Sequence, residues 1–244
     1  MIPIQPLLDR LADIPGMEAG SKRLVVVLGQ LGDFDSIEYA QALVPALPRL
    51  EQAGIRPLAI AIGDQAGADR FCDFTGFPPD LLQIEPDHQL HRALGLSAGL
   101  QAPGGPWPSL LLMCAGIGSP GTLKEVLRGY TGDRSAPQRF DDDEQVTTGV
   151  LPSFPAALFR RAGGGGFQRP FELATVRLRN MNEVLRHWGT YVPDDRFITQ
   201  RGGTFLLDDD DSLLYVYRDR GILGFSESMA RPLAFLDPWL NDAR

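Results

Sequence analysis

The strongest constraint on the fold comes from two short apolar runs, LVVVL at 24–28 and PLAIAI at 57–62. Each run is short and continuous, which is typical of a strand that is buried on both faces of a sheet. Residues 36–53 lie between the runs and have a helical composition. Because a helix of this length returns the chain to the same sheet in the same direction, the sequence predicts a parallel βαβ unit.

The alternation of strand and helix patterns continues on both sides of this unit. We expect helices at 3–14, 64–77 and 87–96, a strand at 81–86, a hairpin of strands at 202–208 and 213–219, and a final helix at 229–240. The hairpin is indicated by two strand-like runs that are joined by the turn sequence DDDDS. This order of elements is typical of a thioredoxin-like α/β fold, in which helices flank a central mixed sheet.

The middle of the chain is not needed for such a sheet. We therefore expect three parts, namely the first part of the core at 1–100, a Pro/Gly-rich insertion at 101–200, and the C-terminal hairpin and helix of the core at 201–244. Within the insertion, a helix is expected at 121–131. A longer helix is predicted by apolar residues that recur three or four apart, which are Phe171, Ala174, Leu178, Met181, Leu185 and Trp188. We expect this apolar stripe to pack on the core.

Composition and charge exclude several classes of function. The formal net charge of -8 argues against general affinity for nucleic acid, because phosphate binding needs an accumulation of Lys and Arg. The longest nearly apolar run, WPSLLLMCAGIG, is too short to cross a bilayer, which takes about 20 residues. The N-terminus lacks the pattern of a signal peptide. We expect a protein of the cytoplasm that does not span a membrane.

No cofactor or metal is predicted. The chain lacks a GxGxxG or GxxxxGK[ST] pattern for nucleotides, and the acidic runs at 141–144 and 208–211 lack the ligand spacing of a calcium loop. Those runs are interpreted as solvated turns. The two cysteines, Cys72 and Cys114, form neither a CxxC motif nor a disulfide framework, which fits a reducing compartment.

The turn between the first strand and the following helix carries the sequence GDFDSIEY at 32–39. Asp35 followed by Glu38 resembles a helix capping box. The acidic side chains place negative charge where the helix would otherwise stabilise an anionic nucleophile. Ser36 lacks a GxSxG elbow and an adjacent histidine, so we interpret it as part of a structural cap.

Four stretches of the chain match one known family in order and spacing. They are LVVVLGQLGDFDSIEYAQAL, FCDFTGFPPDLLQIEPDHQLHRALGL, LKEVLRGYTGD and QRGGTFLLDDDDSLLYVYRD. They resemble the peroxiredoxin-like branch of the alkyl hydroperoxide reductase/thiol-specific antioxidant (AhpC/TSA) family, within the thioredoxin superfamily. The resemblance implies that the redox cysteine pair of active members corresponds to Ser36 and Tyr39 here, so that the site is degenerate. The insertion resembles versions from photosynthetic microbes, which implies a role near the photosynthetic apparatus.

Two thiols remain as alternative redox groups. Cys72 lies in a helical segment between Phe71 and Phe74, and a thiol in apolar surroundings has a raised pKa and forms little thiolate at neutral pH. The same interpretation applies to Cys114 within LLLMCAGIG. We interpret both as structural residues. The alternative is that one of them has become a displaced redox thiol.

The insertion carries a local excess of positive charge. Six arginines stand out, Arg160, Arg161, Arg169, Arg177, Arg179 and Arg186, near a GGGG stretch at 163–166 whose amides can approach an anion closely. One interpretation is a docking surface for an acidic partner, a phosphate or an anionic lipid head group, which leaves peripheral contact with a membrane complex open. The other is a solvated helix face that balances the acidic core.

Three functional hypotheses follow. The leading one is a redox-silent peroxiredoxin-like protein that binds a protein partner through residues 101–200. The alternative is a thiol-dependent antioxidant, either a peroxidase or a disulfide reductase, that uses Cys72 or Cys114. A third is a small-molecule binder whose pocket walls would be aromatic residues of the insertion, Trp107, Phe167, Trp188 and Tyr191. The oligomeric state is left open.

Overall fold

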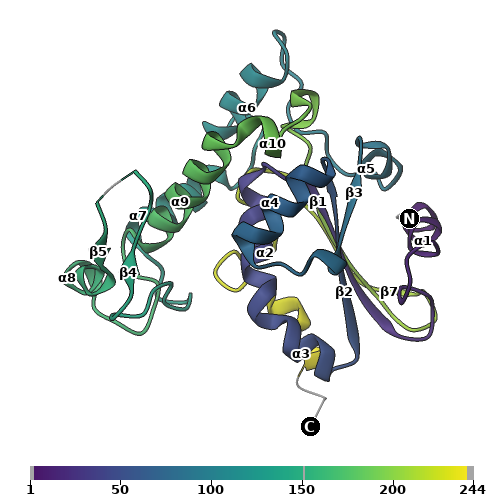
Figure 1. The fold of residues 1–244 in the computed structure, drawn as a ribbon, viewed down its shortest axis with the longest axis horizontal. Helices are drawn as coiled ribbons and strands as arrows, with labels where there is room; N and C mark the ends of the chain where they lie inside the picture. The colour runs from purple at the N-terminus through teal and green to yellow at the C-terminus, as the bar shows by residue number, and fades with distance from the viewer. Residues whose placement is uncertain (1–2, 151, 241–244) are drawn as a thin grey trace.

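A five-stranded mixed sheet forms the centre of the protein (Figure 1), in a computed structural model that describes residues 3–150 and 152–240. The strand order is β3-β2-β1-β6-β7. The strands β1 (Lys22–Gln30), β2 (Ile55–Ile62) and β3 (Leu82–Glu85) are parallel, whereas β6 (Gly203–Leu207) and β7 (Leu213–Arg218) are antiparallel. The thioredoxin-like fold that the sequence predicts, including its βαβ unit and hairpin, is confirmed.

The apolar run in β1 is continuous because both faces of the sheet are covered. Successive side chains of a strand point to opposite faces, so Leu24 and Val26 pack in one apolar cluster while Val25 and Val27 pack in another. The first cluster lies under the helices α2 (Phe34–Leu43) and α4 (Gln65–Thr75) and the C-terminal elements η5 (Ala234–Leu236) and α11 (Asp237–Leu240). The second lies under α1 (Gln5–Leu11) and α5 (Gln89–Ala93).

Several predicted helices are shorter than expected. The helix predicted at 36–53 is instead α2, a 3-10 turn η1 (Val44–Ala46) and α3 (Leu47–Gln52). The interruption contains Pro45 and Pro48, which lack the backbone N–H that a continuous helix needs. The final helix predicted at 229–240 is likewise reduced to η5 and α11, next to Pro232 and Pro238. A further 3-10 turn, η2 (Pro79–Leu81), precedes β3.

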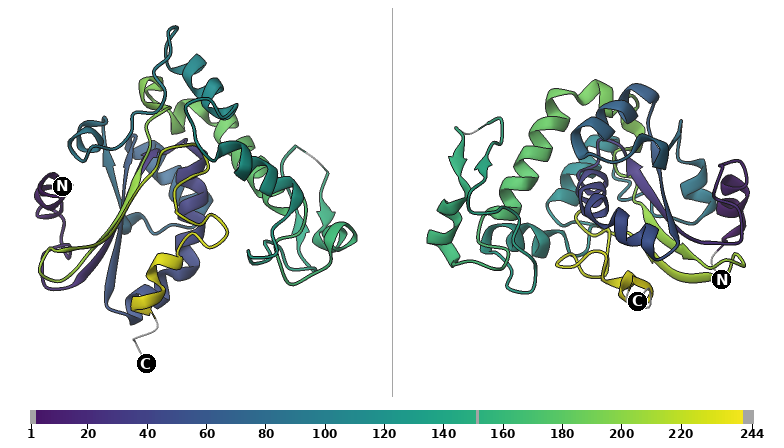
Figure 2. Two further views of the ribbon diagram at one scale, coloured as in Figure 1. Left: turned by 180° about the vertical axis from the view of Figure 1, so that it is seen from behind. Right: turned by 60° about the horizontal axis from the view of Figure 1, so that its bottom comes forward.

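The residues between the two halves of the sheet form helices and a small outer lobe. In order they are α6 (Pro106–Cys114), α7 (Thr122–Thr131), β4 (Gln145–Val146), β5 (Phe154–Pro155), η3 (Ala156–Phe159), α8 (Arg160–Gly163), α9 (Glu172–Arg186), α10 (Trp188–Tyr191) and η4 (Asp195–Phe197). Figure 2 shows that the lobe formed by β4, β5 and α8 stands away from the sheet and is connected to the rest by α7 and α9.

The helix α9 lies where the sequence predicts a helix, but the expectation that its apolar stripe packs on the core is wrong for most of the stripe. Phe171, Met181 and Leu185 are exposed, and only Trp188, beyond the end of α9, packs against the main core. The inward side of α9 combines the buried Leu173 and Val184 with polar contacts, since Arg177 donates to Glu38 and Asn180 donates to Gln41. The stripe therefore forms an open surface.

None of the helices described, within residues 3–150 and 152–240, has both the length and the apolar character needed to span a membrane.

Candidate functional site

The turn between β1 and α2 is built around Asp33. This residue has extended backbone angles and is the N-cap of α2, where its carboxylate accepts a hydrogen bond from the Asp35 amide at 3.4 Å. The capping box predicted for Asp35 and Glu38 is not formed, because α2 begins earlier than the sequence pattern indicates. Asp35 lies in the first turn of the helix, and the Glu38 carboxylate pairs with the Arg177 guanidinium at 2.7 Å.

Arg201 joins this turn to the other half of the sheet. It lies just before β6 and is fully buried, and its guanidinium is 2.9 Å from the Asp33 carboxylate and 3.1 Å from the Asp35 carboxylate. Its Nε donates to the carbonyl of Thr199 at 3.0 Å. Asp35 in turn accepts a hydrogen bond from the amide of Leu223 at 2.7 Å. The turn at 32–39 is therefore filled by a buried polar network.

Three carboxylates in this network face one guanidinium. Burial raises the pKa of Asp33 and raises the pKa of Asp35 well above its usual range, while Arg201 opposes the change. Burial also raises the pKa of Asp219 to about 7. One oxygen of Asp219 accepts from the amide of Gly202 at 3.2 Å, and the other is buried with no hydrogen-bond partner. Asp219 can therefore hold a proton near neutral pH.

Ser36 and Tyr39, the two positions that the family resemblance predicts for a cysteine pair, are both buried. The Ser36 hydroxyl has no hydrogen-bond partner, so no base is positioned to activate it. The Tyr39 hydroxyl lies 2.8 Å from that of Thr204, and its ring stacks on Phe225 with 4.5 Å between centroids. The cavity beside these residues measures about 10 Å³, which is room for about one water molecule. This cavity has no space for a peroxide substrate beside Ser36.

Replacing Tyr39 with phenylalanine is expected to lower the free energy of unfolding by about 1–2 kcal/mol, because the Thr204 hydroxyl loses its partner inside the protein. The measurement is urea denaturation followed by circular dichroism. The matched control is Tyr217→Phe, since the described structure gives the Tyr217 hydroxyl no hydrogen bond, and this change is expected to cost less than ~0.5 kcal/mol. Equal losses in the two variants would contradict this assignment.

The two thiols occupy different places. Cys72 is buried in α4, and burial raises its pKa to about 11. Cys114 is exposed at the end of α6 and lines hollows that also include Phe34 and Asp33, at the start of α2. Burial of the sulfur and the negative charge of Asp33 raise the pKa of Cys114. Both cysteines are free, and of the two only Cys114 lines hollows beside the turn between β1 and α2.

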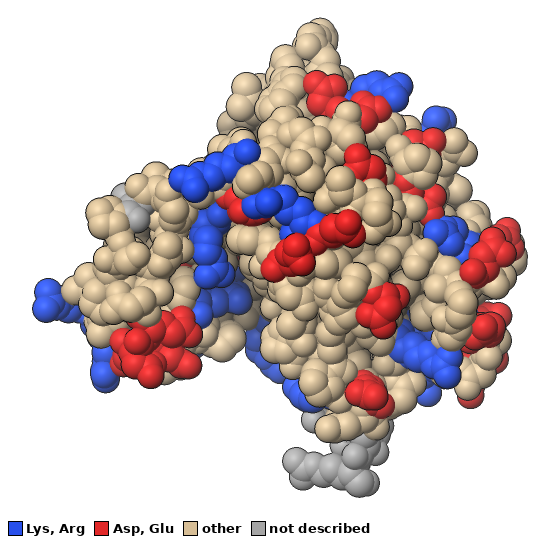
Figure 3. All heavy atoms as spheres, viewed as in Figure 1, with Lys and Arg blue, Asp and Glu red and all other residues tan. Residues whose placement is uncertain are grey.

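The six arginines singled out in the sequence do not share one environment. Arg169 is fully buried between Glu172 and Asp142, so it holds parts of the insertion together, whereas Arg177 pairs with Glu38 and joins the insertion to α2. The remaining four, Arg160, Arg161, Arg179 and Arg186, are at least partly accessible to solvent. Arg160 pairs with Asp142, and Arg186 donates to the carbonyl of Gly149. Figure 3 shows Lys and Arg side chains gathered along a hollow between the outer lobe and the core. Anion docking there stays a prediction.

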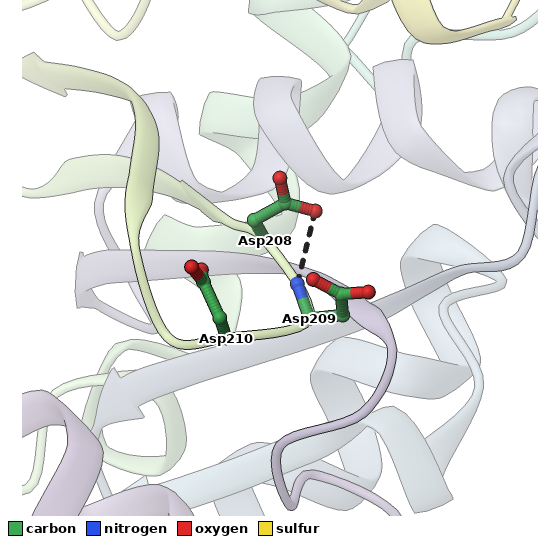
Figure 4. Close-up of side chains that lie close together, drawn as sticks. All are labelled: Asp208, Asp209 and Asp210. Carbon is green, nitrogen blue, oxygen red and sulfur yellow. Dashed lines mark hydrogen bonds between the residues drawn. The ribbon is translucent and has the colours of Figure 1, made fainter.

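One acidic group among the described residues has carboxylates close enough together to be considered as a metal site, Asp208, Asp209 and Asp210 in the β6–β7 turn. Figure 4 shows that their carboxylates point in different directions. The Asp208 carboxylate accepts from the amide of Asp209 at 2.9 Å and pairs with Lys22 at 3.0 Å. These contacts are those of a solvated hairpin turn.

A groove of about 430 Å³ opens between α7 and α9 and reaches the start of α2. Its walls are mainly apolar and include Val126, Tyr130, Phe171, Leu178, Met181, Phe34 and Cys114. None of the four aromatic residues proposed as walls of a small-molecule pocket lines it. Of those four, the Trp107 ring packs in a tilted arrangement against the Trp188 ring with 4.9 Å between centroids, and Tyr191 is buried in the core. Trp188 lines a smaller hollow of about 30 Å³ beside Asp33 and Phe34, so the large groove gives the third hypothesis no support.

Sequence reasoning missed Arg201, Asp219 and the groove. In the stretch QRGGTFLL, Arg201 is a charged residue just before a strand that the sequence predicts to be buried, and this position could have indicated a buried charge. Asp219 gave a similar signal at the end of β7. Neither signal shows that the two residues meet Asp33 and Asp35, because those contacts span more than 160 positions of the chain.

Comparison with solved structures finds distant similarity. Two solved structures from Xanthomonas campestris are similar, a peroxiredoxin Q with 11% identity and a TM-score of 0.40, and the bacterioferritin comigratory protein with 12% and 0.39. Each match covers 93% of this chain and 82% of that protein. No curated protein matches the chain.

The family model described as AhpC/TSA antioxidant enzyme matches residues 42–221, which is well over half of the chain. The matched range begins after the turn at 33–39, so the match itself says nothing about the residues that replace the cysteines. It includes both strands of the C-terminal hairpin and the whole insertion. This chain is a member of the AhpC/TSA antioxidant enzyme family, in agreement with the motifs of its sequence.

Proposed function

We propose that this protein is a redox-silent member of its family that acts by binding a protein partner through residues 101–200. The observation that carries the proposal is the buried Arg201 guanidinium, which bridges Asp33 and Asp35 at the family's redox turn. A thiolate at that position would have to form beside two buried carboxylates, which disfavour a further negative charge.

The state of the two cysteines supports redox silence. The pKa of each thiol is raised, first of all by burial, so both are mainly protonated at neutral pH. The thiolate is the form that attacks a peroxide. No lysine, arginine or histidine forms an ion pair or a hydrogen bond with either sulfur in the described structure, so nothing there favours the thiolate by direct contact.

The distribution of exposed apolar side chains supports binding through the insertion. In the part of the chain that the structure describes, all eleven exposed large hydrophobic side chains lie between Trp107 and Leu185. The thioredoxin-like core has none among its described residues. Exposed apolar surface of this extent is typical of an interaction site. The cytoplasmic location and the proximity to a membrane complex inferred from the sequence stay predictions.

The test is hydroperoxide consumption by the purified full chain with a dithiol reductant. We expect no consumption above the rate of the reductant alone. The matched variants are Cys72→Ser and Cys114→Ser, which should behave like the parent protein. An enzyme-like rate that disappears in one of these variants would refute redox silence and would identify the thiol responsible.

Cys114 supports a second candidate function, a thiol peroxidase with a displaced thiol. It is exposed, and it lines hollows beside Asp33 and Phe34 at the redox turn, whereas Cys72 does not. In this reaction the thiolate attacks a hydroperoxide oxygen, forming a sulfenic acid and releasing an alcohol, and an external dithiol then reduces the sulfenic acid.

Timed alkylation with mass spectrometry separates the two candidates. Under our proposal, the alkylation rate of Cys114 at pH 7 is below that of a free cysteine and rises steeply above pH 9, because its pKa is raised. Cys72 should stay unmodified until the protein is denatured. Fast modification of Cys114 at pH 7, together with oxidation by peroxide, would favour the peroxidase.

A further inference from the structure

The helix α7 is oriented with its apolar side outward. Leu123, Leu127 and Tyr130 are 55%, 62% and 53% exposed. The inner side carries Glu125 and Arg128, whose side chains form an ion pair at 2.7 Å and are largely buried. An amphipathic helix on the surface of a folded protein normally turns its apolar side toward the core. The opposite orientation of α7 therefore leaves its apolar side exposed to solvent.

The helix α9 has the same orientation. Phe171, Met181 and Leu185 are 52%, 38% and 56% exposed, although their spacing is that of a buried stripe. Its inner side is fixed by Arg177, which donates to Glu38 at 2.7 Å and to the Glu125 carbonyl at 2.8 Å. The polar contacts therefore hold both helices so that their apolar sides remain outside.

The two apolar sides form one surface. Gly129 of α7 lies against Ala174 of α9, so closely that a Cβ at Gly129 would be 3.4 Å from the Ala174 nitrogen. The rings of Tyr130 and Phe171 meet edge to face with 6.2 Å between centroids. We call this surface the α7/α9 face and define it by Leu123, Leu127, Tyr130, Phe171, Met181 and Leu185, with the groove between the helices.

The size of the α7/α9 face matches that of a specific interface. With about 200 Å² for a fully exposed large apolar side chain, its six side chains present about 600 Å². A standard interface buries about 800 Å² on each partner, somewhat more than half of it apolar. Covering the α7/α9 face would therefore supply the apolar part of a stable dimer interface.

The shape and charge of the face point to a second copy of this chain. The ridge formed by Leu123, Leu127 and Tyr130 lies beside the groove, so a two-fold axis can place the ridge of one copy against the groove of the other. The six residues of the face are uncharged, and the charged groups beneath it are paired, Arg128 with Glu125 and Arg177 with Glu38. Two copies of a chain with net charge -8 therefore bring no like charges together within this face.

We infer that the α7/α9 face pairs with the same face of a second copy in a two-fold symmetric dimer. This inference rests on the proposed function, since it names the partner of the insertion. It also places the groove, with Cys114 in its wall, inside the dimer interface.

The test is analytical ultracentrifugation of the full chain from about 1 to 100 μM, the range in which moderate dimers dissociate. We expect a dimer, and Leu127→Glu should raise its dissociation constant at least ~100-fold, about tenfold for each of the two carboxylates that would be buried. The matched control is Leu158→Glu in η3, an exposed leucine outside the face, which should leave the dissociation constant unchanged. Equal thermal unfolding of the two variants checks that both are folded.

Three outcomes of these measurements would overturn the inferred dimer. A monomer at 100 μM excludes the dimer, and a dimer that survives Leu127→Glu uses another surface. A monomer that binds vesicles of neutral phosphatidylcholine, and loses this binding in Leu127→Glu, would identify a lipid surface as the occupant. The hydroperoxide assay is independent of these results, so redox silence can stand when the dimer fails. Conversely, an active peroxidase that still dimerises through this face would refute only the redox-silent part of the proposed function.

Discussion

Replacing Arg201 with methionine is expected to lower the free energy of unfolding by about 3–5 kcal/mol. Methionine has a similar length but no charge, so Asp33 and Asp35 would remain buried without the guanidinium that lies 2.9 and 3.1 Å from them. An uncompensated buried carboxylate is costly because it has lost its hydration. The measurement is urea denaturation at pH 7, monitored by circular dichroism.

The matched control for this experiment is Arg196→Met. Arg196 pairs with Asp194 at 2.5 Å, but its side chain is exposed, so the change is expected to cost less than ~0.5 kcal/mol. Arg201→Lys keeps the positive charge but cannot contact Asp33 and Asp35 with a planar guanidinium. Its free energy of unfolding should lie between those of the parent protein and Arg201→Met. If Arg201→Met were as stable as Arg196→Met, the buried network would not hold the turn in place.

Replacing Asp219 with asparagine is expected to stabilise the protein at pH 8 by up to about 4 kcal/mol and to change little at pH 4. The carboxyl shifts from an ordinary pKa of 3.8 to about 7 in the folded protein, and ~1.4 kcal/mol corresponds to each tenfold change in proton affinity. Between these pH values the folded state binds more protons than the unfolded state. The free energy of unfolding therefore falls as pH rises from about 4 to about 7, and it levels off above pH 7.

The comparison of parent and variant at each pH isolates this effect. Burial lowers the pKa of His91 to about 4, so the stability that neutral His91 contributes is lost as pH falls from about 6.5 through 4, in the opposite direction. That contribution is the same in the parent and in Asp219→Asn, and it cancels in their difference. The control is Asp209→Asn in the exposed hairpin turn, which should change stability by less than ~0.5 kcal/mol at every pH. A difference between Asp219→Asn and the parent that does not vary with pH would contradict the assignment.

Together these two variants test how buried charges are held at the turn between β1 and α2. Arg201 supplies the positive charge that compensates the buried Asp33 and Asp35. Among the residues described, Asp219 is not paired with a second cation, and its raised pKa lets it bind a proton near neutral pH. A turn filled in this way is a structural element of the core. It leaves the insertion, with its exposed apolar side chains, as the part of the chain available for binding.

The sequence by itself determined the sheet. The runs at 24–28 and 57–62 are apolar at successive positions because helices cover both faces, and this is a local pattern that the chain carries whatever its partners. The hairpin follows in the same way from two strand-like runs around a polar turn, and the observed strands Gly203–Leu207 and Leu213–Arg218 agree with it. The family motifs, too, are stretches of consecutive residues, and the family match covers three of the four, beginning after all but the end of the first.

The tertiary structure alone decided which surface is exposed and what fills the turn. A helical stripe such as Phe171, Met181 and Leu185 has the same period whether it faces the core or the solvent. Its direction is set by contacts with distant elements, such as those of Arg177 with Glu38 and the burial of Val184 in the core. Likewise, the effect of Arg201 depends on its meeting Asp33 and Asp35, far away in the chain. Periodicity reports that a residue has an apolar or polar neighbour on its own element. It carries no information on which distant element that side will meet, because that is fixed by packing of the whole chain.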